Sequence, residues 1–265
     1  MTERRSALIT GSSRGIGAAM AEALAADGCN VMLNGFGDGD EIEAERKRLA
    51  DTYNVDVAYN GADLGKEDQV DALFKATEEA FGAVDILVNN AVIRYFHAIE
   101  DFPRDEWRNS LDVNVTAPLI LTQLALPGMK ARGWGRIINF SSVMGLAGRS
   151  GRVDYITSKH AMLGLTRSTA AEVGEIEGIT CNAICPGSVL TPNTEIKIAE
   201  LGEEEGLEFE DAKRRYLEIR NQKLDYITPA RVARLVAFLC EEASMDITGV
   251  ALPIDQGRSA TWLEV

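Results

Sequence analysis

The feature that most constrains the fold is a regular alternation of short apolar runs with longer amphipathic stretches. The runs predict strands at Ser6–Thr10, Asn30–Leu33, Val55–Tyr59, Val84–Asn89, Arg136–Phe140, Ile179–Cys185 and Val250–Ile254. The stretches between them predict helices at Ile16–Ala26, Glu41–Thr52, Glu67–Phe81, Asp105–Met129, Asp154–Val173 and Ala230–Leu239. Such alternation builds a parallel sheet with helices on both faces. The predicted fold class is therefore α/β, a doubly wound parallel sheet of about seven strands.

We expect one domain over residues 1–265, because no repeat, low-complexity tract or Pro/Gly/Ser-rich linker divides the chain. One segment, at about residues 193–225, interrupts the alternation. It is densely charged and has helical periodicity with a thin apolar face. It could be a solvated helical hairpin. Its position after the sixth strand favours a helical lid over a substrate site.

Composition excludes several classes of partner. The formal net charge of −14 argues against nucleic acid and against anionic membrane surfaces. No apolar run approaches twenty residues and no signal peptide is recognisable, so we expect a cytoplasmic protein. The four cysteines lack CxxC spacing and read as buried, inert thiols. With only two histidines in the chain, we predict no catalytic metal.

A glycine-rich loop joins the first predicted strand to the first helix. It reads Thr10-Gly11-Ser12-Ser13-Arg14-Gly15-Ile16-Gly17. Glycines in this position permit a tight turn and let the backbone approach a pyrophosphate, which the helix N-terminus then binds. Because the loop lies between a strand and a helix, it predicts a Rossmann-type dinucleotide site.

Tyr155 and Lys159 lie one turn apart on a predicted helix. At roughly 4 Å, and with an effective dielectric constant of about 20, an ammonium attracts a phenolate by about 4 kcal/mol before desolvation. A tyrosine assisted in this way can exchange a proton with a substrate near neutral pH. Ser142 follows the fifth predicted strand and is a candidate hydrogen-bond donor to the same substrate.

These motifs resemble the short-chain dehydrogenases/reductases along the whole chain. Five features match that family in order and spacing: the glycine spacing, Asn89-Asn90-Ala91, Asn114 in DVNV, Ser142 and Pro186-Gly187. The resemblance implies a catalytic set of Asn114, Ser142, Tyr155 and Lys159. It also implies that Asn114 fixes a water for a proton relay, and that the protein assembles as a homotetramer through its long helices.

Four further segments resemble the D-3-hydroxybutyrate dehydrogenase branch of the family. They are NGFGD from Asn34, GADL from Gly61, GITCNAICPG from Gly178 and VLTP from Val189. The cofactor-binding residues implied by the resemblance are Gly11, Ser13, Arg14, Gly15, Ile16, Gly17, Phe36, Asp63, Leu64, Asn90, Ala91, Tyr155, Lys159, Pro186, Gly187, Val189 and Thr191. Among these, Asp63 and Leu64 would border the adenine, Phe36 the adenosine ribose and Thr191 the carboxamide.

The chain departs from that branch where substrate is held. At four positions the Gln, His, Lys and Trp of that branch are replaced by Arg94, Met144, Arg152 and Ser188, in that order. Val92 replaces the glycine of the NNAG motif, and we expect a local shift of the backbone there. The predicted substrate-binding residues are Arg94, Ser142, Met144, Arg152, Tyr155 and Ser188. Arginines suit carboxylate or phosphate, so a larger anionic hydroxy or keto acid is one hypothesis. A neutral ketone beside ordinary surface arginines is the other.

The cofactor is expected to be NAD(H) in preference to NADP(H). The NGFGD resemblance favours NAD(H), although Asp38 lies slightly beyond the usual acidic position and Arg14 resembles the basic residue of NADP-preferring members.

The predicted function is interconversion of a secondary alcohol and a ketone, with a hydroxy acid related to 3-hydroxybutyrate as the favoured substrate. Three alternatives stay open: a 3-oxoacyl thioester reductase, a dehydrogenase of neutral alcohols or sugars, and a non-catalytic dinucleotide-binding regulator.

Overall fold

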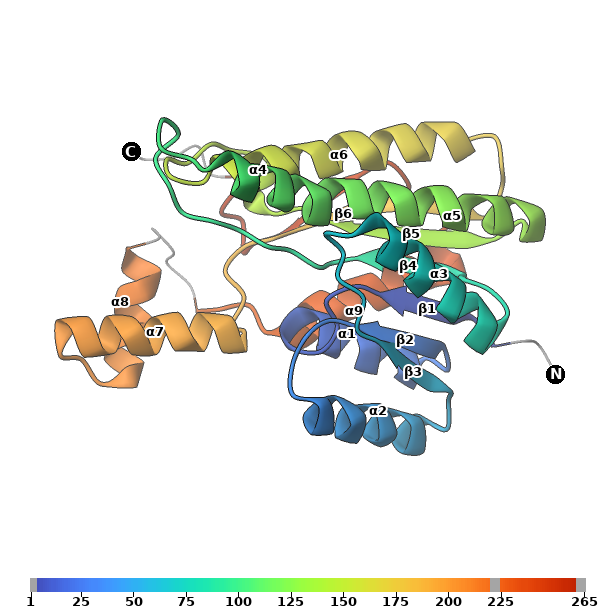
Figure 1. The fold of residues 1–265 in the computed structure, drawn as a ribbon, viewed down its shortest axis with the longest axis horizontal. Helices are drawn as coiled ribbons and strands as arrows, with labels where there is room; N and C mark the ends of the chain where they lie inside the picture. The colour runs from blue at the N-terminus through green and yellow to red at the C-terminus, as the bar shows by residue number, and fades with distance from the viewer. Residues whose placement is uncertain (1–3, 220–224, 261–265) are drawn as a thin grey trace.

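The computed structural model describes residues 4–219 and 225–260 and contains a seven-stranded parallel sheet in the order β3-β2-β1-β4-β5-β6-β7 (Figure 1). The strands are β1 (Ser6–Ile9), β2 (Asn30–Asn34), β3 (Val57–Asn60), β4 (Ile86–Asn89), β5 (Gly135–Phe140), β6 (Ile179–Pro186) and β7 (Ala251–Ile254). The order reverses between β3-β2-β1 and β4 onward, which places a ligand crevice beyond the carboxyl ends of β1 and β4. The predicted α/β doubly wound sheet is confirmed.

Helices cover both faces of the sheet. They are α1 (Gly15–Ala26), α2 (Gly39–Tyr53), α3 (Glu67–Phe81), α4 (Arg104–Leu111), α5 (Ala117–Arg132), α6 (Val153–Val173), α7 (Pro192–Glu205), α8 (Phe209–Glu218) and α9 (Pro229–Cys240). Short helical turns are η1 (Asp112–Thr116), η2 (Val143–Gly145) and η3 (Glu242–Ser244).

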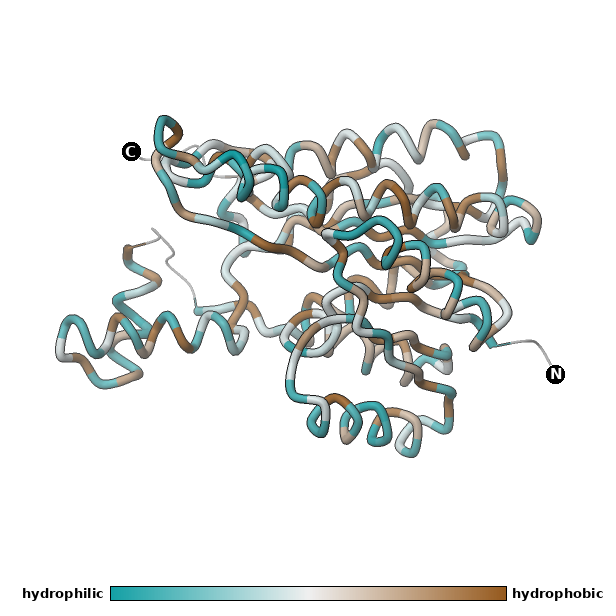
Figure 2. The backbone as a smooth tube through the Cα atoms, viewed as in Figure 1, coloured by the Kyte–Doolittle hydropathy of each residue, from teal (hydrophilic) through white to brown (hydrophobic). Residues whose placement is uncertain are grey.

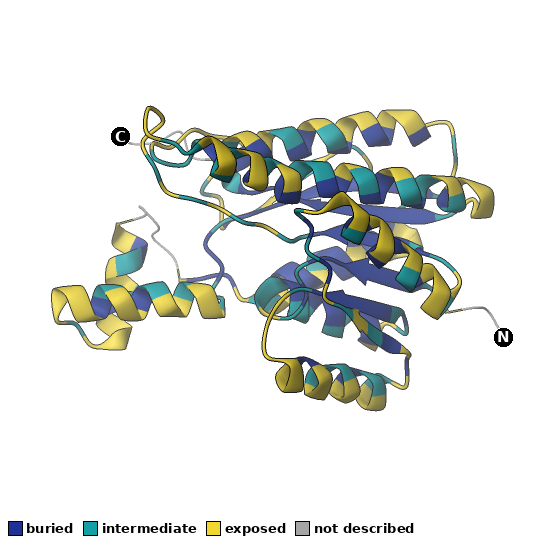
Figure 3. Cartoon of the chain, in the orientation of Figure 1, coloured by how far each residue is buried: buried dark blue, intermediate teal, exposed yellow. Residues whose placement is uncertain are grey.

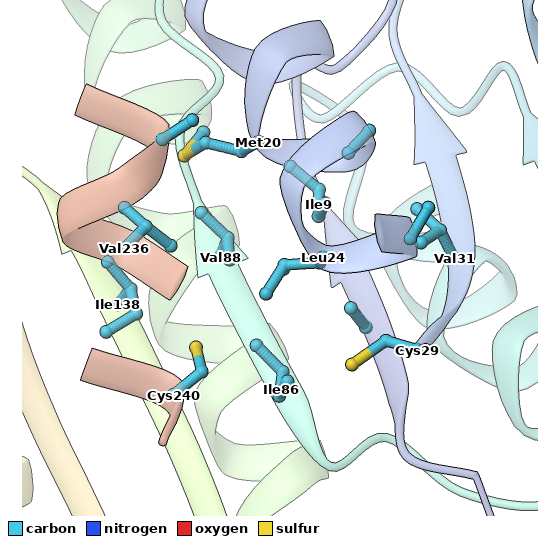
Figure 4. Close-up of a cluster of buried hydrophobic side chains, with 14 of the residues drawn as sticks. Ile9, Met20, Leu24, Cys29, Val31, Ile86, Val88, Ile138, Val236 and Cys240 are labelled. Atoms are coloured by element: carbon cyan, nitrogen blue, oxygen red, sulfur yellow. The ribbon is translucent and has the colours of Figure 1, made fainter. Parts of the chain in front are cut away.

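Two hydrophobic clusters hold these layers together. On one face, Met20 and Leu24 of α1 and Val236 of α9 pack against strand residues such as Ile9 and Val88 (Figure 4). On the other face, α3, α5 and α6 pack against the opposite side chains of the same strands. Full burial of one leucine-sized side chain contributes roughly 1.5–3 kcal/mol, so these clusters account for most of the stabilisation of the sheet.

The predicted helix Asp105–Met129 differs from the structure. It is divided into α4 and α5 by the π-helical turn η1, which contains Asn114. Hydrophobic periodicity of 3.6 residues does not reveal one wider turn, and such turns occur mostly at functional sites. The other predicted elements are present, with ends displaced by at most two residues.

Helices α7 and α8 project from the body of the molecule (Figure 1). They pack on each other through a small cluster that includes Ile198, Ala212 and Leu217. Gly206, at φ +67°, ends α7 and allows the chain to turn back. Most of their surface is exposed (Figure 3). The charged segment is thus helical as predicted, residues 220–224 lie outside the described part, and its role as a lid stays a prediction.

The distribution of polar residues agrees with this architecture. Hydrophilic and hydrophobic residues alternate along the edge helix α2 (Figure 2). No helix in residues 4–219 and 225–260 is long and apolar enough to cross a membrane. All four cysteines are buried and free, as expected from their sequence context. The described residues form no group of three or more His, Cys, Asp or Glu side chains able to hold a metal.

Candidate active site

A cavity of about 850 Å³ lies at the carboxyl ends of the strands. Its walls come from the segments that follow β1, β2, β3, β4, β5 and β6, together with α6 and α7. Every predicted site residue lines it except Asn114. The topology therefore brings together residues that are far apart in the sequence.

The glycine loop forms one wall with little room for side chains. Gly11 has φ +64°, and an added Cβ there would lie 2.9 Å from the Ala91 Cα. A Cβ on Gly17 would overlap the Gly11 carbonyl oxygen. Arg14 gives α1 no side-chain cap, so the first N–H groups of the helix are left for a ligand. These features fit a dinucleotide pyrophosphate.

Replacing Gly17 by alanine is expected to destabilise the protein by about 1–3 kcal/mol and to weaken dinucleotide binding, because the loop backbone must shift to admit the Cβ. Gly164 provides the matched control: it lies in α6 with open space around its Cα, and alanine there should be neutral or stabilising by up to about 1 kcal/mol. Urea unfolding and dinucleotide titration measure both effects. Equal stability of the two variants would contradict this account of the loop.

The far end of this wall fits an adenosine. Phe36, Asp63 and Leu64 line the cavity there. Asn34, at the end of β2, donates from its side-chain amide to the carbonyls of Asn60 and Ala62 and so holds these segments together. Asp38 accepts from the amides of Asp40 and Glu41 as the cap of α2 and does not line the cavity.

Ser142 and Lys159 are held in place by backbone contacts. The Ser142 hydroxyl accepts from the Met144 amide at 3.1 Å, which leaves its own hydrogen to donate to a substrate. The Lys159 ammonium donates to the Phe140 carbonyl at 2.6 Å, and its nitrogen lies 5.6 Å from the centre of the Tyr155 ring. All three side chains line the same cavity.

The pKa of Lys159 is lowered to about 7, mainly by burial and also by the positive charge of Arg94, against a smaller opposing contribution from Cys185. A dinucleotide ribose that accepts hydrogen bonds from this ammonium would favour its charged form. The charged form of Lys159 is therefore more favourable with the cofactor bound than without it.

Asn114 lies behind the cavity rather than in its wall. It is buried in η1, where its Oδ1 accepts from the Ile93 amide and its Nδ2 donates to the Ile93 carbonyl, each at 2.9 Å. Nδ2 also lies 3.2 Å from the Ser158 hydroxyl. These contacts fix the segment that carries Arg94. The proton relay implied for Asn114 stays a prediction.

Arg94 and Arg152 form the substrate end of the cavity with Met144 and Ser188. The guanidinium carbon of Arg152 lies 5.0 Å from the centre of the Tyr155 ring, and that of Arg94 lies 5.8 Å from it. Arg152 also stacks on Phe96 at 4.2 Å. The structure thus brings both arginines close to Tyr155.

Sequence reasoning missed several lining residues at this end. They are Phe96, Arg149, Ile196, Lys197, Glu200 and Tyr216. Lys197 belongs to the charged run of α7, where the sequence does not distinguish it from solvated residues. Its ammonium nitrogen lies 4.6 Å from the centre of the Phe96 ring. Arg149 stands in a loop whose sequence gives no signal of its direction. Val92 is exposed and lines the cavity, and the local shift expected there stays a prediction.

Comparison with known proteins gives one consistent result. Residues 5–201 match the short chain dehydrogenase family model. The chain is 40% identical to D-beta-hydroxybutyrate dehydrogenase of Cupriavidus necator, covering 97% of this chain and 98% of that protein, and 37% identical to the enzyme of the same name from Rhizobium meliloti, covering 97% and 99%. The crystal structure of L-sorbose reductase from Gluconobacter frateurii with NADPH and L-sorbose superposes with a TM-score of 0.92, at 29% identity and 98% coverage of both chains. The glycine loop, the Ser142–Tyr155–Lys159 cluster and these matches agree: the chain belongs to the short-chain dehydrogenase family and is an oxidoreductase that acts on CH–OH and keto groups.

Proposed function

We propose that this enzyme interconverts a hydroxy acid and the corresponding keto acid, related to 3-hydroxybutyrate and acetoacetate. The observation that carries the proposal is the position of Arg94 and Arg152, whose guanidinium groups both lie over the Tyr155 ring. A guanidinium binds a carboxylate through two parallel hydrogen bonds. The similarity to two D-beta-hydroxybutyrate dehydrogenases supports the same substrate class.

The residues of the chain then divide the chemistry. Ser142 donates to the substrate oxygen, and Tyr155 removes its proton in oxidation or returns it in reduction. Lys159 binds the nicotinamide ribose hydroxyls. The side of the cavity assigned to the nicotinamide is lined by Pro186, Gly187, Val189 and Thr191. The bound cofactor supplies or accepts the hydride.

Replacing Arg152 by alanine is expected to lower kcat/KM for the hydroxy acid by about tenfold or more, with a much smaller effect on a neutral secondary alcohol. Arg167 provides a matched control, since it is exposed near the other end of α6 and its loss changes the net charge equally. Steady-state kinetics with 3-hydroxybutyrate and butan-2-ol measure the ratio. An unchanged preference for the acid would overturn the assignment.

We further propose that NAD(H) is preferred over NADP(H), by a modest factor of less than about a hundredfold. In the segment directly after β2, residues 35–38, no acidic side chain lines the cavity where it could repel a 2′-phosphate. Arg14 is the single basic residue of the glycine loop. The resemblance of NGFGD, Asn34 to Asp38, to the D-3-hydroxybutyrate dehydrogenase branch supports NAD(H). Comparison of kcat/KM for NADH and NADPH, in wild type and Arg14→Ala, measures this. Higher efficiency with NADPH would contradict the proposal.

Assembly as a homotetramer and residence in the cytoplasm stay predictions. Exposed apolar side chains on α5 and α9, such as Leu119 and Phe238, support self-association.

A further inference from the structure

The cavity wall has a charge opposite to that of the molecule. The chain carries a net charge of −14, yet seven basic side chains line the cavity against two acidic ones, Asp63 and Glu200. The basic residues are Arg14, Arg94, Arg149, Arg152, Lys159, Lys197 and Arg258. Arg14 and Lys159 are explained by the phosphates and ribose of a dinucleotide. The remaining charges all lie toward the substrate end.

Three of these arginines share that end, and the buried side chain of Asp154 acts on one of them, Arg152. Arg94, Arg149 and Arg152 take part in none of the ion pairs formed among the described residues, although acidic residues outnumber basic ones in the chain, 41 to 27. The Nε of Arg152 is buried and lacks a hydrogen-bond partner within the described residues. A buried polar group of this kind is usually satisfied by water or by a ligand when the fold does not satisfy it.

The three charges also act on one another. Burial lowers the pKa of Arg152, and the positive charges of Arg94 and, to a smaller extent, Arg149 add to this effect against opposing contributions from Tyr155 and Asp154. Arg94 likewise lowers the pKa of Lys159. A single carboxylate at Tyr155 would neutralise one arginine and leave the second without a counter-charge. Two carboxylates on one small molecule would neutralise both.

Aromatic packing holds these guanidinium groups in position. Arg152 stacks between the rings of Tyr155 and Phe96, and Lys197 from α7 lies on Phe96 as well. Arginine stacked on aromatic rings loses less side-chain freedom when it binds an anion. The guanidinium carbons of Arg94 and Arg152 lie 5.8 Å and 5.0 Å from the centre of the Tyr155 ring, so one short molecule bound at Tyr155 can reach both groups.

We propose that the preferred substrate is a dicarboxylic hydroxy or keto acid, with one carboxylate bound by Arg152 and the other by Arg94, assisted by Arg149. This inference rests on the proposed hydroxy acid function and narrows it. The secondary alcohol lies between the two acid groups, next to Ser142 and Tyr155. In oxidation the C–H bond breaks and its hydride passes to the oxidised nicotinamide, while the hydroxyl proton passes to Tyr155. The products are the oxo diacid, the reduced cofactor and one proton.

3-Hydroxyglutarate and 3-hydroxybutyrate form the test pair, because they differ by one carboxylate and the diacid is achiral. With NAD⁺, the wild-type enzyme is expected to show a kcat/KM at least about tenfold higher for 3-hydroxyglutarate than for either enantiomer of 3-hydroxybutyrate. In Arg94→Met this ratio should fall to near one. In the matched control Arg167→Met, on the exposed face of α6, it should stay as in wild type. A wild-type ratio of one or below overturns the inference and leaves the hydroxy acid function standing.

A binding measurement separates the two claims. Calorimetry on the enzyme with NAD⁺ bound compares glutarate with butyrate, neither of which can be oxidised at a carbinol. The inference predicts that glutarate binds at least about tenfold more tightly and that Arg94→Met removes the difference. Equal affinities overturn it, whether or not the enzyme turns over any alcohol. Tighter glutarate binding without turnover of any hydroxy acid supports the two-carboxylate site and overturns the proposed function.

Discussion

Replacing Tyr155 by phenylalanine is expected to lower kcat by about a hundredfold to ten-thousandfold, with dinucleotide binding changed by no more than a few-fold. In the proposed mechanism the phenol exchanges a proton with the substrate oxygen, and general acid–base catalysis contributes an effect of this size. The ring itself remains, so the stacking of Arg152 and the position of Lys159 are preserved. Steady-state kinetics and fluorescence titration with the reduced cofactor measure the two quantities.

Tyr53→Phe is the matched control for this prediction. The Tyr53 hydroxyl lies 3.1 Å from a Glu22 carboxylate oxygen at the surface of α2, and its ring does not line the cavity. Its loss should leave kcat unchanged. If Tyr155→Phe retained more than a tenth of the wild-type kcat, another group would have to be the proton donor.

Replacing Lys159 by methionine is expected to abolish most activity and to change how stability depends on pH. The ordinary pKa of a lysine is 10.5, and burial lowers that of Lys159 to about 7 in the folded protein. Between these values the unfolded chain binds more protons than the folded one, so stability rises with pH. For one proton the rise from pH 7 to pH 9 is about 2 kcal/mol.

The variant lacks this titration, so its stability should rise by about 2 kcal/mol less over the same interval. The interval ends at pH 9 because the raised pKa of Cys29, about 11, makes stability fall with pH above the ordinary thiol value. Urea unfolding of both proteins without cofactor, at several pH values from 7 to 9, gives the difference. Parallel curves would show that Lys159 keeps its ordinary pKa and stays protonated in the folded protein over this interval.

The sheet could be predicted because its signals are local and repeated. Each strand is an apolar run, and the loop from Gly11 to Gly17 stands between a strand and a helix, as a dinucleotide site requires. The positions of Ser142, Tyr155 and Lys159 beside one cavity could be predicted for the same reason, since Ser142 follows β5 and the other two share one face of α6.

The rest depends on contacts between distant segments. The π-helical turn at Asn114 is coupled to Ile93, and no periodicity within the helix encodes that contact. Arg94, Arg149 and Lys197 come from three separate segments and meet only in the folded protein. The reversal at Gly206 did carry a signal, because glycine after a charged helical run is a common helix end. Specificity was therefore harder to predict than the reaction class.

The central claim is that hydride passes directly between a nicotinamide cofactor and the carbinol carbon of a substrate at Tyr155. Reduction of the keto acid with cofactor fully deuterated at the reactive ring carbon tests it most directly, with mass spectrometry of the alcohol product. The account predicts one deuterium atom per alcohol, bound to the carbinol carbon, and loss of this labelled product in Tyr155→Phe. An alcohol that forms without deuterium at that carbon would contradict it.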